Sequence, residues 1–216
     1  MIKDNVHNIL KELPQGTQLV AAAKGRSADE VKQAVDAGVK IIVENYVQQA
    51  EAVFNMIGNE VKWHFVGHLQ KNKVKKAVRI FDMIETVDSV KLAEEINRQC
   101  EMRGKTMPVL IEINSGREQQ KFGVSPENAE ALIRELTKLK NISIMGLMTM
   151  APFFKDAEKA RAYFKRTKEL FDSVKKLNLP GVDMKYLSMG MSATYKIAIE
   201  EGANIVRIGT EIFGEK

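Results

Sequence analysis

A lysine ends the first apolar run of the sequence, residues 19–27, which reads LVAAAKGRS. Lysine is almost never fully buried without a partner, so Lys24 either reaches solvent at a strand end or stands where an amine is needed. Desolvation and neighbouring cations lower the pKa of a lysine amine and free its lone pair for attack on a carbonyl carbon. Lys24 is therefore a candidate for Schiff-base chemistry, with a solvated strand end as the alternative.

Two short segments near the C-terminus carry residue types that suit an anion. SMGMS, residues 188–192, offers the hydroxyl groups of Ser188 and Ser192, and it precedes an expected helix whose first amides would attract negative charge. RIGT, residues 207–210, adds Gly209 and Thr210. Each segment alone is also ordinary turn chemistry. Together they predict a phosphate-binding cup.

An arginine, Arg207, stands beside this cup. If its side chain points inward, the guanidinium stays protonated and donates to a ring nitrogen, which must then remain an unprotonated acceptor. A reactive lysine with a phosphate cup favours pyridoxal phosphate as the ligand, and the arginine would make that ligand a weakened electron sink. The alternative is a surface arginine paired with Glu211 or Glu200.

Short β-rich runs alternate along the chain with longer segments of helical period. The expected strands cover residues 18–23, 40–43, 62–66, 83–86, 107–113, 142–147, 185–188 and 204–208. A helix over residues 2–12 precedes them, and Ser27, Asp88 and Ser125 are placed to cap later helices. About eight βα units predict a parallel sheet closed into a single (βα)8 TIM barrel. The alternative, an open doubly wound sheet, is not supported by any G-x-G-x-x-G motif after a strand.

A barrel of this kind would bring the candidate residues together. Ligands bind at the carboxyl ends of its strands, and phosphate groups bind at the loops after the seventh and eighth strands. Lys24 follows the first expected strand and residues 43–46 the second, while SMGMS and RIGT lie at the ends of the seventh and eighth. We expect all four to meet at one mouth.

Length, composition and charge narrow the class of protein. The 216 residues, 44% hydrophobic and 28% charged, suit one globular domain over residues 1–216. The net charge of +5 favours anionic partners, whereas the basic segment 71–79 is typical of a solvated helix face, so no nucleic acid is expected. A single cysteine, Cys100, a charged N-terminus and the lack of long apolar runs predict a cytoplasmic protein without a membrane span.

Six motifs resemble the pyridoxal phosphate homeostasis protein family, of the YggS/PROSC type, over nearly the whole chain. They are AAAKGR, VENYVQQA, WHFVGHLQKNKVK, EINSGREQQKFGV, GLMTMAP and LSMGMSATYKIAIEEGANIVRIGTEIFG. The resemblance implies the barrel of the alanine racemase N-terminal domain, which is a TIM barrel of the pyridoxal phosphate (PLP) fold-type III kind, here with an extra N-terminal helix.

The resemblance also assigns site residues where positions match. It implies that Lys24 forms the Schiff base with pyridoxal 5'-phosphate, that Arg207 faces the pyridine nitrogen and that Asn45 lies near the cofactor. It places the phosphate contacts at Ser188, Ser192, Gly209 and Thr210. The sequence departs from the family at Val43, where a glycine is usual, and at Thr194, where an aspartate is usual.

The resemblance implies intracellular PLP homeostasis or carriage rather than turnover, with PLP-dependent apoenzymes as recipients. Racemisation on this fold needs a second base, which a further domain supplies in the resembling enzyme, whereas this chain ends soon after the expected barrel. For the same reason we expect a monomer. Two enzyme alternatives stay open: a small PLP-dependent amino-acid racemase, and a Schiff-base aldolase that uses Lys24 on a phosphorylated carbonyl substrate. No metal is predicted, because His64 and His68 fall on a strand and a turn.

Overall fold

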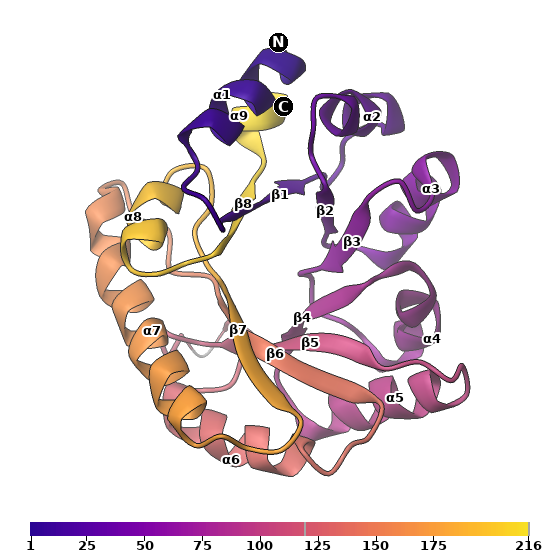
Figure 1. Cartoon of the computed structure of the whole chain (residues 1–216), viewed down its shortest axis with the longest axis vertical. Helices are drawn as coiled ribbons and strands as arrows, with labels where there is room; N and C mark the ends of the chain where they lie inside the picture. The colour runs from indigo at the N-terminus through magenta and orange to yellow at the C-terminus, as the bar shows by residue number, and fades with distance from the viewer. Residues whose placement is uncertain (119, 216) are drawn as a thin grey trace.

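The computed structural model describes residues 1–118 and 120–215. Eight parallel strands close into a barrel in the order β1 to β8, and the helices lie around the outside of this ring (Figure 1). The strands are β1 (Gln18–Ala22), β2 (Ile41–Glu44), β3 (Lys62–Phe65), β4 (Met83–Val87), β5 (Met107–Ile113), β6 (Ile142–Thr149), β7 (Val182–Ser188) and β8 (Ile205–Ile208). The predicted TIM barrel is confirmed.

The helices follow the strands in the order expected of βα units. They are α1 (Ile2–Glu12), α2 (Ala28–Asp36), α3 (Val47–Ile57), α4 (Lys71–Ile80), α5 (Val90–Glu101), α6 (Pro126–Leu136), η1 (Ala157–Ala160), α7 (Arg161–Lys176), α8 (Tyr195–Glu200) and α9 (Thr210–Phe213). The predicted N-terminal helix, α1, lies beside α9 at the end of the chain (Figure 1). Within the described residues, none of these helices has the length and apolar character that crossing a membrane requires.

Strand bounds differ from the prediction mainly at β6 and β7. Strand β6 continues to Thr149, which pairs with Ile113 at the end of β5. Strand β7 begins at Val182, which pairs with Ile144 of β6. Both extensions come from pairing with a neighbouring strand, which a single sequence does not display.

Two of the predicted helix caps have different outcomes. Ser27 caps α2, because its hydroxyl oxygen accepts a hydrogen bond from the Glu30 amide at 3.2 Å. The prediction for Asp88 is wrong, since α5 begins after Ser89. The Asp88 carboxylate instead accepts a hydrogen bond from the Gly123 amide at 3.4 Å, which joins the loops after β4 and β5.

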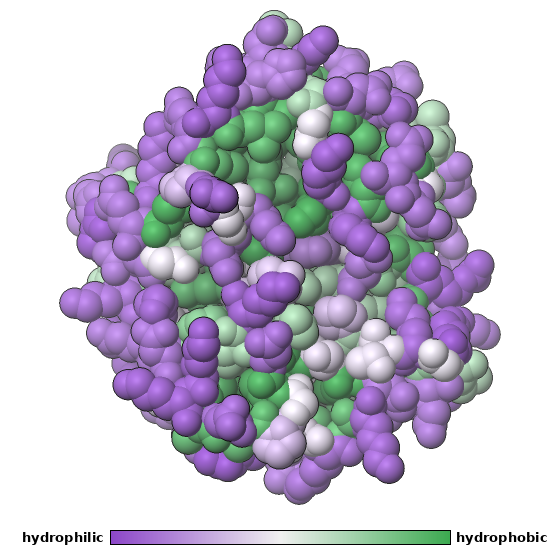
Figure 2. All heavy atoms as spheres, in the orientation of Figure 1, coloured by the Kyte–Doolittle hydropathy of each residue, from purple (hydrophilic) through white to green (hydrophobic). Residues whose placement is uncertain are grey.

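Apolar side chains form layers on both faces of the barrel wall. The interior is filled by two clusters, Val20, Ile41, Val43, Val66 and Ile205 in one and Met83, Leu110 and Met148 in the other. Trp63 and Phe65 belong to the larger layer between strands and helices, so the residue between them, His64, points to the interior. The helices turn polar residues outward, and the outer edge of the molecule is mostly hydrophilic (Figure 2). Polar residues inside the barrel are therefore unusual, and we expect each of them to have a hydrogen-bonding partner or a functional role.

Candidate functional site

Lys24 lies in the turn that follows β1, at the carboxyl end of the barrel. Ala22, at the end of the strand, packs against the interior cluster. The Lys24 side chain is exposed, and its Nζ lies 5.8 Å from the centre of the Tyr46 ring, just after β2. The amine therefore stands at the predicted mouth, where a carbonyl ligand could reach it.

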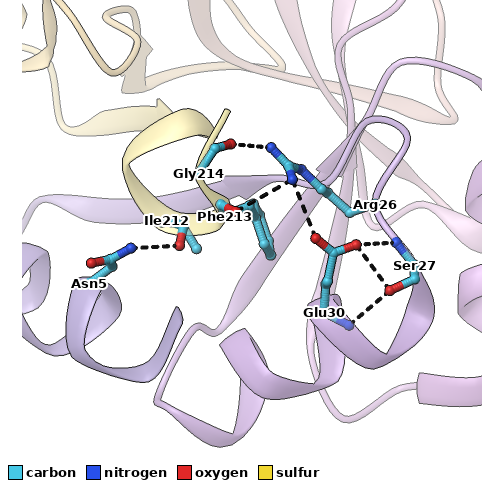
Figure 3. Close-up of polar contacts among 7 residues, drawn as sticks. All are labelled: Asn5, Arg26, Ser27, Glu30, Ile212, Phe213 and Gly214. Carbon is cyan, nitrogen blue, oxygen red and sulfur yellow. Dashed lines mark hydrogen bonds and ion pairs between the residues drawn. The ribbon is translucent and has the colours of Figure 1, made fainter. Parts of the chain in front are cut away.

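The loop that carries Lys24 is tied to the C-terminal helix α9. Arg26 donates hydrogen bonds to the carbonyl oxygens of Phe213, at 3.4 Å, and of Gly214 (Figure 3). The guanidinium carbon also lies 5.4 Å from the centre of the Phe213 ring. Since α9 begins at Thr210, these contacts hold the lysine loop beside one of the predicted phosphate loops. Arg26 could not be chosen from the sequence, because its partners lie at the other end of the chain.

The two predicted phosphate loops are joined to each other. The Gly209 amide donates to the Ser192 hydroxyl oxygen at 3.3 Å. Gly190 adopts a φ of +90°, and a Cβ there would lie 2.6 Å from the Cβ of Ala198, so the turn after β7 requires glycine. The Thr210 side chain is exposed at the start of α9. The structure thus brings Ser192, Gly209 and Thr210 into one rim segment.

The helix after β7 is α8, which begins at Tyr195. It is six residues long, and the amides of Thr194 and Tyr195 donate to the carbonyl oxygen of Met191 at 2.7 and 2.8 Å. The Thr194 hydroxyl oxygen accepts from the Met191 amide at 3.1 Å. Thr194 therefore stabilises the turn rather than capping the helix, and an anion would have to use other groups of these loops.

A chain of buried polar side chains crosses the floor of the mouth. Arg207 donates to the Ser188 hydroxyl oxygen at 2.5 Å and to the Thr149 carbonyl oxygen at 2.9 Å. Ser188 in turn donates to the Glu85 carboxylate at 2.6 Å, and the other oxygen of Glu85 lies 2.7 Å from His64 Nδ1. These side chains come from β8, β7, β4 and β3, so the barrel's closure is what assembles them.

Arg207 is an interior residue and not a surface one. It is 4% exposed, so the alternative of a surface pair with Glu200 or Glu211 is wrong, and Glu200 pairs with Arg161 at 2.7 Å. Burial lowers the pKa of Arg207, against the opposing charges of nearby glutamates. The guanidinium is held by a network that fixes its direction.

Glu85 is the charged partner that the sequence analysis missed. Burial alone would raise the pKa of its carboxyl group, but the hydrogen bond and charge of His64, with the charge of Arg207, hold that pKa below its usual value. Arg207 Nη1 lies 3.9 Å from the Glu85 carboxylate. The signal that could have found it is a carboxylate inside an expected buried strand, residues 83–86.

Asn45 stands apart from this network. It lines a cavity of about 250 Å³ at the ends of β2 and β3, together with Tyr46, His68 and Lys73. Tyr46 is the residue whose ring lies near Lys24 Nζ. Asn45 is thus on the lysine side of the mouth, and the structure gives no contact between it and Arg207.

Glu44, the residue before Asn45, is a second buried carboxylate. It is 1% exposed, and its Oε2 has no hydrogen-bond partner within residues 1–118 and 120–215. Burial raises its pKa to about 7, and a backbone hydrogen bond from Asn45 opposes the shift only in part. The side chain is therefore packed at the end of β2 with only partial compensation for its burial.

The residues at the mouth fit a ligand that has an aldehyde, a phosphate and a ring nitrogen. Lys24 offers an accessible amine, and Arg207 offers a buried donor fixed by its partners. Gly209 has no side chain, so a ligand could approach its backbone directly at the rim. Among the described residues, no group of three or more His, Cys, Asp or Glu side chains is arranged to hold a metal ion.

Comparisons with known proteins agree with this barrel over its full length. Residues 1–216 match the family described as alanine racemase, N-terminal domain. The chain is 38% identical over 200 residues to the pyridoxal phosphate homeostasis protein of Aquifex aeolicus, with 92% of this chain and 87% of that protein covered. It is 40% identical over 211 residues to the human protein of the same name, with 92% and 76% covered.

Solved structures extend the comparison. PipY of Synechococcus elongatus, in a structure with PLP bound, is 31% identical with a TM-score of 0.91, and 99% of this chain and 100% of that chain are covered. An alanine racemase of Clostridium difficile, at 19% identity and a TM-score of 0.82, shares the fold over 100% of this chain and 56% of its own. On the sequence matches and the closed barrel together, the chain belongs to the pyridoxal phosphate homeostasis protein family.

Proposed function

We propose that this protein binds pyridoxal 5'-phosphate through a Schiff base on Lys24 and serves intracellular PLP homeostasis or carriage rather than turnover. Residues 1–216 act as one PLP-binding domain. The observation that carries the proposal is the buried Arg207, fixed by Ser188 and Thr149 at the floor of the mouth whose rim carries Lys24. PipY with PLP bound, and relatives named for PLP homeostasis, support it.

The residues of this chain divide the binding between rim and floor. Lys24 would hold the aldehyde carbon, and the joined rim segment of Ser192, Gly209 and Thr210 would hold the phosphate, with Asn45 on the lysine side. Ser188 stays a predicted phosphate contact. Its hydroxyl group already donates to a carboxylate and accepts from Arg207, however, which favours a role in positioning that guanidinium.

The floor of the mouth supports retention rather than carbanion chemistry. Bound PLP supplies an aldehyde and a ring that withdraws electrons most strongly when its nitrogen is protonated. Arg207 can only donate, so it leaves a facing ring nitrogen without a proton. Glu85 and Ser188 keep the guanidinium in place. A barrel arranged in this way binds the group while weakening its capacity to stabilise negative charge.

The proposal extends to the location of the protein, its oligomeric state and the recipients of its cofactor. A cytoplasmic monomer, with PLP-dependent apoenzymes as recipients, is consistent with an open lysine at the rim and with a buried, unpaired Cys100. Light scattering after gel filtration measures the mass, and transfer of PLP to an apoenzyme in its presence tests the recipient.

An absorbance spectrum tests the covalent bond. Wild-type protein loaded with PLP should show a visible absorbance band that borohydride removes, and Lys24→Ala should lack the band. Lys91→Ala, at an exposed position on α5, is the matched control and should keep it. A band that survives in Lys24→Ala contradicts the assignment.

A second measurement separates carriage from turnover. Loaded protein incubated with amino acids in deuterated water should show no exchange at the α-carbon, whereas rapid exchange would indicate a racemase. Borohydride reduction that adds mass only when a sugar phosphate is present would instead indicate an aldolase.

A further inference from the structure

A cavity of about 350 Å³ lies at the carboxyl ends of β5 and β6, beside the proposed cofactor residues. Phe122, Phe153 and Met191 line it, and these large apolar side chains are 53%, 90% and 46% exposed. Exposed apolar groups that gather around one cavity are typical of a binding surface. A smaller cavity shares Phe153 and Met191 with it and reaches Arg207, so the two spaces adjoin.

One buried carboxyl group opens into this cavity. Glu112 is 6% exposed and lines the cavity from the end of β5. Within the described part of the chain its carboxylate has no hydrogen bond, and the charges acting on it are those of Asp88 and Arg207. Lys121, which also lines the cavity, is paired with Glu118. A buried carboxylate without a donor is costly, so a ligand that supplies one is favoured there.

We propose that this cavity binds a small organic ammonium ion with an apolar body. The N–H group of such an ion would give the Glu112 carboxylate a charge-assisted hydrogen bond. The ring of Phe153, and the face of Phe122 that the stacked His68 ring does not cover, would contact the apolar body and attract the positive charge. An anion of the same shape would be repelled by Glu112. The site adjoins the proposed cofactor site but does not use Lys24, so its test does not depend on the Schiff base.

The probe for this site is the N,N-dimethyl-2-phenylethylammonium ion, a tertiary amine that cannot form a Schiff base. Calorimetric titration of the full chain at pH 8 should show binding. Glu112→Gln should weaken it about tenfold or more, as expected for a hydrogen bond between charged groups. Phe153→Ala should weaken it by a smaller factor. Glu101→Gln, an exposed glutamate at the end of α5, is the matched control and should bind as the wild type does.

Proton release gives a readout that a purely structural Glu112 would not produce. Burial, together with the Asp88 charge, raises the pKa of Glu112 to about 7, while the Arg207 charge opposes the shift. A bound cation favours the ionised carboxylate, so binding at pH 7 should release up to about half a proton per cation from the wild type but none from Glu112→Gln. Titrations in two buffers of different ionisation enthalpy measure this release, with Lys121 the other titratable group on the cavity wall.

Two results would overturn the proposal: no binding by the wild type, or equal affinities of the wild type and Glu112→Gln. Should that variant fail to fold, the affinity of the wild type for 2-phenylethanol tests the proposal instead. This neutral analogue should bind about tenfold more weakly than the cation. Equal affinities for the two again overturn it. Lys24→Ala should bind the cation normally, so loss of PLP binding alone counts against the proposed function and loss of cation binding alone counts against this site.

Discussion

Buried carboxylates lie both at the floor of the mouth and near its rim, but their pKa values are shifted in opposite directions. On the floor, Glu85 has two hydrogen-bonding neighbours, His64 and Ser188, and its pKa is held below its usual value. At the strand ends near the rim, burial raises the pKa of Glu44 and of Glu112 to about 7. All three are nearly inaccessible to solvent. Burial is common to them, so the partners decide which carboxylate keeps its charge.

The floor is therefore held in place by its own hydrogen bonds, whereas the rim has groups available to bind a ligand. The floor has its donors and acceptors matched within the protein, so Arg207 is held in one position before any ligand arrives. The rim keeps the Lys24 amine exposed, and no donor from residues 1–118 or 120–215 reaches the Glu112 carboxylate. A site of this design fixes a ligand from below and leaves its upper side accessible, which suits carriage.

The largest expected loss of stability comes from removing a charged partner in the floor network. Glu85→Ala leaves the buried Arg207 guanidinium without its nearest opposing charge, and removing one partner of a buried pair costs about 3–5 kcal/mol. Urea unfolding should show a loss of that size in the free energy of unfolding. Glu94→Ala, an exposed glutamate on α5, serves as control and should change stability by less than about 0.5 kcal/mol. A loss for Glu85→Ala as small as the control's would contradict the account of the floor.

Replacing the Glu44 carboxylate, whose burial is only partly compensated, should raise the free energy of unfolding instead of lowering it. The pKa of Glu44 is raised on folding from 4.5 to about 7, so its contribution to stability is full below pH 4.5 and is lost as the pH rises through 7. Glu44→Gln should therefore be more stable than the wild type at pH 8, by up to about 3 kcal/mol, and nearly equal to it at pH 4.5. Chemical unfolding at several pH values measures the gap between the two proteins. A gap that does not widen with pH would show that Glu44 is compensated.

The smallest expected effect tests whether Ser188 belongs to the floor network or to the phosphate contacts at the rim. Ser188→Ala removes hydrogen bonds to two charged groups, so the protein without cofactor should lose about 1.5 kcal/mol of unfolding free energy. Ser173→Ala, at an exposed position on α7, is the control. Unchanged stability together with weaker PLP binding would instead place Ser188 among the phosphate contacts.

The sequence predicted the architecture well, because the barrel is encoded in local alternation. All eight expected strands exist, and the closure that joins them follows from repeated βα units. The errors lie where pairing decides the outcome, as at the start of β7, or where a side chain finds a distant partner, as Asp88 does in the Gly123 amide.

The site was predicted only in its outline. Lys24, Ser192 and Arg207 could be chosen because their types and positions at strand ends suggest chemistry. The link from His64 to Glu85 could not, because it depends on the register of β3 against β4 and on which residues face inward. The tie from Arg26 to Gly214 joins opposite ends of the chain and leaves no local pattern.

The position of the covalent bond is the most direct test of the central claim. Protein loaded with PLP would be reduced with borohydride and digested, and each lysine-containing peptide would be weighed by mass spectrometry. The added pyridoxyl phosphate should lie on the peptide that contains Lys24 and on no other. A label on a different lysine, or an unlabelled Lys24 peptide in a protein that still retains PLP, would contradict it.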